Sequence, residues 1–220
     1  MNLRKRADEI FAWALAQRSD DLAEQWRAHS FGAAKVAERI AEKIGLDSDK
    51  AYAMGLLHDV GRYQGIHTGM RHIIIGYQKL MNEGLPEIAR ICLTHSFNPK
   101  EKVAILDLQD DEEEKFVKEF VSNVEYDDYD RLIQLADFMS GAHGVTTIER
   151  RFCSVLYRHN FPNAHEELSV LYRLREYFSE KCKMDIYDLF PDELSEAPFR
   201  GIPGDYLGNE FTVNKRKGKE

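Results

Sequence analysis

Residues 51–63 read AYAMGLLHDVGRY, and this stretch decides how the rest of the chain is interpreted. Its first seven residues carry no charge and suit a buried helix, which then ends in the adjacent polar pair His58 and Asp59. An imidazole and a carboxylate side by side at a helix end can turn toward one divalent cation, because hydrolytic metals accept nitrogen and oxygen ligands together. Alone, such a pair is more often a surface turn, so its meaning depends on the remaining sequence.

Outward from this stretch, apolar residues recur at intervals of three and four, the pattern of amphipathic helices, while two-residue alternation is almost absent. The pattern predicts an all-α protein, a bundle of about eight or nine helices. Gly45 and Gly84 are expected to end two of them, and Pro86 suits the first turn of another. The predicted helices cover residues 3–18, 20–44, 48–57, 70–82, 86–94, 111–124, 129–140, 147–157 and 164–182.

Length and composition favour one domain. The 220 residues suit a single core, and 43% hydrophobic with 31% charged residues is typical of a folded globular chain. We expect one helical domain over residues 1–190 and an irregular tail over residues 191–220, where proline and glycine replace the helical pattern. The three cysteines are odd in number and widely spaced, which indicates neither a disulfide framework nor a zinc knuckle.

Charge and hydropathy narrow the partners and the location. No apolar run approaches the roughly 20 residues of a membrane helix, and Asp8 and Glu9 interrupt a start that otherwise imitates a signal peptide, so we expect a cytoplasmic protein without membrane contact. A net charge of −8 disfavours an extended nucleic-acid surface, although a local basic site could hold a nucleotide-sized anion. The acidic run 110–114 suits a solvated helix start. Phe11 and Trp13 could support a homodimer, but core packing is the commoner use of such residues.

Further ionisable residues lie in strongly apolar helical surroundings: His29, His72, His95 and Asp137. Asp137, for example, lies between Leu135 and Phe138. A buried carboxylate or imidazole is costly unless it is paired, neutralised or bound to a metal. Each one alone is more often a satisfied core residue. Together with the His-Asp pair, however, they indicate a metal site.

Taken in order, six residues resemble the metal ligands of the HD superfamily of metal-dependent phosphohydrolases: His29, His58, Asp59, His72, His95 and Asp137. The resemblance covers about residues 25–139 and implies a helical bundle of the HD-domain type. It implies one ion held by His29, His58, Asp59 and Asp137. His72 and His95 resemble the subgroup with two ions, in which Asp59 bridges to the second. Imidazole and carboxylate ligands suit Mn, Fe, Co, Ni and Zn alike, so the metal is left open.

The resemblance implies hydrolysis of a phosphate ester or anhydride in a small, nucleotide-like molecule, with metal-activated water as the nucleophile. His58, Asp59 and Arg62 are the expected catalytic residues, because Arg62 follows Asp59 by three positions and its guanidinium could contact a phosphate oxygen. Lys100 is a weaker candidate of the same kind. The remaining histidines are interpreted as incidental or surface residues: His67, His143, His159 and His165.

Several branches of the superfamily fit poorly. Gly76-Tyr77-Gln78 does not reproduce the Gly-Tyr-Pro element of the cyclic-dinucleotide phosphodiesterases, and Ser96 replaces their second histidine. Residues 60–62 lack the Glu-Asp couple of the alarmone hydrolases. The nearest resemblance is to small stand-alone bacterial members, which include dinucleoside tetraphosphate hydrolases.

Two alternatives stay open. The same six ligands hold a mixed-valence di-iron centre in HD-fold oxygenases, and iron content with oxygen uptake would favour that function. A non-catalytic domain could instead bind a nucleotide as a sensor or serve as a scaffold, in which case ligand would shift the melting temperature without turnover.

Overall fold

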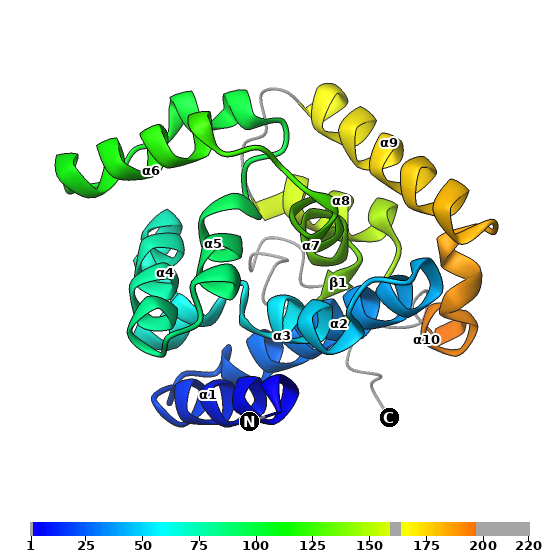
Figure 1. The fold of residues 1–220 in the computed structure, drawn as a ribbon, viewed down its shortest axis with the longest axis horizontal. Coiled ribbons are helices and arrows are strands. Elements are labelled where there is room, and N and C mark those ends of the chain that lie inside the picture. Colours follow the sequence, from blue (N-terminus) through cyan, green and yellow to red (C-terminus); the bar gives the residue numbers. More distant parts are fainter. Residues whose placement is uncertain (1, 159–163, 197–220) are drawn as a thin grey trace, which may run out of the picture.

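The computed structural model describes residues 2–158 and 164–196 and confirms an all-α architecture (Figure 1). Within these ranges the α-helices are α1 (Leu3–Ala16), α2 (Ala23–Ile44), α3 (Ser48–Leu57), α4 (His72–Asn82), α5 (Pro86–Thr94), α6 (Asp111–Asn123), α7 (Asp128–Phe138), α8 (Ile148–Arg158), α9 (Ala164–Cys182) and α10 (Pro191–Glu196). Four 3-10 helices connect them: η1 (Val60–Gln64), η2 (Ile66–Arg71), η3 (Lys100–Ile105) and η4 (Ile186–Leu189). One small antiparallel hairpin joins β1 (Ser140–Gly141) to β2 (Gly144–Val145).

Helix boundaries follow local capping chemistry. Gly45 and Gly84 adopt left-handed backbone angles, with φ of 79° and 73°, directly after α2 and shortly after α4. The Asp47 carboxylate accepts a hydrogen bond from the Lys50 amide at the start of α3. Asp127 and Asp130 form a reciprocal capping box at the start of α7, which is why this helix begins one residue before the predicted position.

The structure differs from the sequence-based expectation at several helix ends. The α-helix predicted from residue 70 begins only at His72, because η2 with a kink at Gly69 precedes it. Residues 191–196 were expected to be irregular but form α10, which starts at a proline and whose Glu193 pairs with Lys35 and Arg39 of α2. The rest of the predicted tail, residues 197–220, lies outside the described residues.

The main core lies where α2 and α3 pack together and α1, α5, α7 and α9 surround them (Figure 1). The two central helices approach closely at Gly55, where an added Cβ would lie 2.7 Å from the Ala33 carbonyl oxygen. A second, smaller apolar cluster joins α4, α5, η3 and α6 and includes Phe97 and Leu106. No helix in the described ranges has both the length and the apolar character to cross a bilayer.

A backbone contact places α4 against the turn that follows α3. An added Cβ at Gly61 would lie 2.0 Å from the carbonyl oxygen of His72 and 2.6 Å from the amide nitrogen of Gly76. Only glycine allows this approach, because any side chain there would collide with backbone atoms. The contact therefore brings the first residue of α4 next to the end of α3.

Candidate metal centre

Five separate parts of the fold bring the six predicted ligand residues together at one point. His29 lies within α2, His58 and Asp59 follow α3, His72 begins α4, His95 follows α5, and Asp137 lies at the end of α7. The four imidazoles and Asp59 are at most 7% exposed, and the Asp137 side chain is 19% exposed. All six residues predicted from the sequence thus form one buried polar cluster.

The two oxygens of Asp59 face different histidines. Asp59 Oδ1 lies 3.0 Å from His72 Nε2 and 3.5 Å from His95 Nε2. Asp59 Oδ2 lies 3.9 Å from His29 Nε2 and 4.0 Å from His58 Nε2. A carboxylate in this position can serve two neighbouring groups of ligands, one with each oxygen.

Asp137 completes the cluster on the side of His29 and His58. Its Oδ1 lies 3.2 Å from His29 Nε2 and 3.9 Å from His58 Nε2. Among the described residues, three sets of ligand atoms lie within 4.8 Å of one another: His29 with His58 and Asp59, Asp59 with His72 and His95, and His58 with His95 and Asp137. The second set is the group that the resemblance implied for one ion. The first set holds three of the four residues implied for the other ion, and the fourth, Asp137, falls in the third set with His58 and His95.

Every imidazole is oriented by a backbone carbonyl. His58 Nδ1 donates to the Gly55 carbonyl at 2.7 Å, and His72 Nδ1 donates to the Gly69 carbonyl at 2.6 Å. His95 uses carbonyls of α5 in the same way, and His29 Nδ1 donates to the Ser140 carbonyl at 3.1 Å. Because a carbonyl only accepts, each Nδ1 carries the hydrogen and each Nε2 presents a lone pair to the cluster.

Two buried atoms of the cluster lack hydrogen-bond partners. Asp59 Oδ1 and His72 Nε2 are inaccessible to solvent and lie 3.0 Å apart, yet their geometry is not that of a hydrogen bond. Unpaired buried polar atoms are rare, because each costs roughly 1–3 kcal/mol. Two lone pairs that are buried near one another without a shared proton fit a missing cation, and the mixture of nitrogen and oxygen donors suits a divalent transition metal.

The protonation states agree with such a cation. Burial alone would raise the pKa of both carboxyl groups, but the charge of Arg62 holds the pKa of Asp59 well below its usual range, and the pKa of Asp137, beside His29 and Arg151, also lies below its usual range. Burial lowers the pKa of His58 to about 4 and also lowers the pKa of His72. Ionised carboxylates and neutral imidazoles are the forms that bind metals. Burial disfavours the charged form of His95 as well, yet nearby Asp59 raises the pKa of this imidazole overall.

Arg62 lies where the sequence placed it, beside Asp59, with its Nε 2.6 Å from Asp59 Oδ2. The α-helix ends at Leu57, but η1 follows, and a three-residue turn keeps positions 59 and 62 on one side. Lys100 lies elsewhere: its ammonium donates to the Val124 carbonyl and lies over the Tyr126 ring. Sequence analysis had ranked Lys100 below Arg62, because only Arg62 follows a predicted ligand by three positions.

The remaining histidines stay outside the cluster as far as the structure describes them. His143 is exposed in the hairpin turn, and His165 is exposed on α9, as expected for incidental residues. The side chain of His67 and the whole of His159 lie outside the described residues.

Sequence analysis missed two arginines. The Nη2 atom of Arg151, on α8, lies 3.9 Å from Asp137 Oδ1. The side chain of Arg18 is only 2% exposed, and its Nη1 donates to the Arg62 carbonyl at 2.9 Å. Neither residue stands near a ligand in the sequence, so no local pattern could have indicated either one.

Comparison with known proteins identifies the same region. A family model described as HD domain matches residues 26–141, which include all six clustered residues. Ribonuclease Y of Mycoplasma capricolum subsp. capricolum is 33% identical over 75 residues, which cover 34% of this chain and 15% of that protein. Ribonuclease Y of Mycoplasma mycoides subsp. mycoides gives the same identity over the same length. The chain therefore spans only about 15% of the length of these relatives. No solved structure matches.

Proposed function

We propose that this chain, which belongs to the HD domain family, is a hydrolase that uses divalent metal to cleave a phosphate ester or anhydride in a small, nucleotide-like molecule. HD domains are generally metal-dependent phosphohydrolases. The relatives with local similarity are named as ribonucleases, which supports hydrolysis of a phosphate bond but does not give the substrate.

The observation that carries this proposal is the pair of unpaired buried atoms at the centre of the cluster, Asp59 Oδ1 and His72 Nε2. Six other buried side-chain polar atoms in the described ranges also lack partners, but none of them is a carboxylate oxygen or an imidazole nitrogen, the atoms that bind metals. We assign one ion to His29, His58, Asp59 and Asp137, and a second to Asp59, His72 and His95. When bound, such ions supply a nucleophilic water at neutral pH and offset the negative charge of the phosphoryl group.

The chain's own residues prepare the site. The Nδ1 hydrogen bonds fix the imidazole rings, and Arg62 holds Asp59 ionised while its Nη groups remain available for a phosphate oxygen. Arg151 brings a second guanidinium to Asp137, on the opposite carboxylate of the cluster. Two guanidiniums beside the two carboxylates suit a dianionic substrate group.

The test combines metal content with turnover. The protein is purified under low oxygen without a metal-binding tag, its metals are measured by elemental mass spectrometry, and phosphate release is followed for a panel of nucleotides and aryl phosphates. We expect about two ions per chain in the wild type. Both should be lost in Asp59→Ala, the ion assigned to Asp137 should be lost in Asp137→Ala, and both should be kept in the surface control His165→Ala.

Other results would redirect or refute the proposal. A wild-type protein that holds no metal after reconstitution contradicts it. Bound iron with oxygen uptake and no phosphate release indicates the oxygenase alternative. Metal binding with a nucleotide-induced rise in melting temperature, but without turnover, indicates a sensor.

A further inference from the structure

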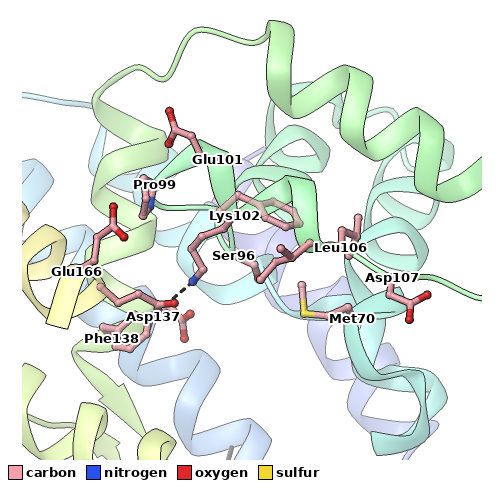
Figure 2. A pocket seen from close by; sticks show the side chains of 13 residues that line it. Met70, Ser96, Pro99, Glu101, Lys102, Leu106, Asp107, Asp137, Phe138 and Glu166 are labelled. Carbon is pink, nitrogen blue, oxygen red and sulfur yellow. Dashed lines mark ion pairs between the residues drawn. The ribbon is translucent and has the colours of Figure 1, made fainter. Parts of the chain in front are cut away.

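A cavity of about 570 Å³ adjoins the candidate metal centre (Figure 2). Asp137 belongs to both the cluster and the cavity wall, and Ser96, whose Oγ lies 3.0 Å from His95 Nε2, also lines the cavity. Its volume falls within the range of about 300–1,000 Å³ that is common for pockets holding small organic ligands. A phosphate held at the cluster would therefore place the rest of its molecule here.

Much of the cavity wall is apolar. Phe97 and Leu106 belong to the second apolar cluster, and Phe138 follows Asp137 directly. At the rim, Met70 is 39% exposed and Ile105 is 75% exposed. Exposed apolar side chains around a cavity favour an occupant with an apolar surface, because contact with it removes them from water.

The charged side chains of the wall are mostly acidic. Its carboxylates are Glu101, Asp107, Asp137, Glu166 and Glu167. Lys102 is the one basic residue in the wall among the described residues, and its ammonium already lies 3.1 Å from Glu167. The cavity away from the cluster is therefore a place of net negative charge, which repels further phosphates or carboxylates on a substrate.

We propose that this cavity holds the organic part of the substrate and selects a phosphate monoester whose organic part is apolar and positively charged, against molecules with additional anionic groups. This inference rests on the proposed function, because it takes the phosphate to lie at the metal centre. The acidic wall favours a single phosphate ester over dinucleoside polyphosphates, the substrates of some of the family members that the sequence resembles.

The test uses three probes of similar size that differ in charge: 4-(aminomethyl)benzyl phosphate, benzyl phosphate and 4-carboxybenzyl phosphate. For the manganese-loaded wild type we expect kcat/KM to fall in that order, by about tenfold or more from the first to the last. Calorimetric binding of the three corresponding phosphonates, which cannot be hydrolysed, should fall in the same order. The phosphonates provide a readout that does not depend on turnover.

Variants locate the selectivity. In Glu166→Gln/Glu167→Gln the wall loses two carboxylates and Lys102 loses its ion-pair partner Glu167. The ratio of kcat/KM between the first and the last probe should therefore fall to about threefold or less. Glu112→Gln removes an exposed carboxylate of α6 that is not part of the wall, and should leave this ratio unchanged.

The two proposals fail in different ways. The cavity proposal is overturned, even when phosphate is released, if the wild type has equal kcat/KM for the three probes or the reverse order. It is also overturned if the kcat/KM ratio between the first and the last probe stays unchanged in the double variant. Phosphonates that bind in the expected order, while none of the three phosphates is hydrolysed, support the cavity proposal and contradict the hydrolase function.

Discussion

Two buried carboxylates on either side of α5, Asp59 and Asp130, differ in the hydrogen bonds that the protein donates to them. Both are at most 5% exposed, and consecutive residues of the chain contact them: Thr94 reaches Asp130, and His95 reaches Asp59. Asp130 accepts hydrogen bonds on both oxygens, from Thr94 Oγ1 at 2.7 Å on one and from Arg90 and the Asp127 amide on the other. Asp59 Oδ1 accepts none.

The two carboxylates differ in the donors that surround them. Around Asp130 the protein itself supplies the donors, so this side chain ties α5 to the start of α7. Asp59 receives a donor on one oxygen only, because Arg62 donates to Oδ2 while the atoms nearest to Oδ1 are the Nε2 atoms of His72 and His95. A cation bound at Oδ1 would supply the missing partner.

The largest expected effect comes from Asp59→Asn. Because both proposed ions use this carboxylate, we expect phosphate release to fall by about 10³-fold or more and bound metal to be lost. Elemental mass spectrometry and initial rates check both parts. Asp130→Asn is the matched control, a buried acid changed in the same way, and metal loss in that variant would break the comparison.

Asp130→Asn should instead lower the free energy of unfolding, by about 3 kcal/mol, because the neutral amide no longer offers a charged partner to Arg90 and its NH2 group cannot accept a hydrogen bond at whichever oxygen position it takes. Urea unfolding of the metal-loaded protein measures this. Bound metal per folded chain should stay at the wild-type value. Wild-type stability in Asp130→Asn would contradict the structural role.

Removal of metal should affect the stability of the Asp59 and Asp130 variants differently. Chelation should lower the free energy of unfolding of the wild type by about 2.7 kcal/mol for each of the two ions, relative to protein with free metal at one hundred times the Kd of each site. Asp130→Asn should lose the same amount, since its metal centre is intact, whereas Asp59→Asn should lose nothing. Denaturant curves with and without chelator provide the measurement, and an equal loss in all three proteins would argue against Asp59 as a ligand.

The smallest expected effect concerns Arg151. If its guanidinium contacts the substrate phosphate beside Asp137, Arg151→Gln should lower kcat/KM by about tenfold without changing bound metal. The neighbouring Arg150→Gln serves as the control, because it changes the same residue type on the same helix. Equal activity of the two variants would exclude the contact.

Local signals made much of the fold predictable. Three helices, α3, α5 and α9, have the bounds that the sequence predicted, because caps, Pro86 and a clear apolar period mark them. The six clustered residues were also predictable, since imidazoles and carboxylates among apolar neighbours are conspicuous in the sequence. Their assembly at one point was confirmed by the structure, while their role as ligands stays a prediction.

What depends on distant contacts was not predictable. In the sequence Asp130 and Asp137 look alike, because both are acidic residues of one predicted helix. Only the fold shows that Thr94 and Arg90 donate hydrogen bonds to Asp130. Arg151 reaches Asp137 from the next helix, and the cavity wall combines η3 with α7 and α9. The short helix α10 was missed because its pairing partners lie on α2, far away in the chain.

The orientation of His29 sets a limit on how far the chain could be shortened. Three imidazoles take their direction from carbonyls within four residues, but His29 takes its direction from Ser140, 111 residues away. Ser140 lies beyond the last of the six clustered side chains. A fragment that ended at Asp137 would therefore keep all six clustered side chains and still lack the carbonyl that orients the His29 ring.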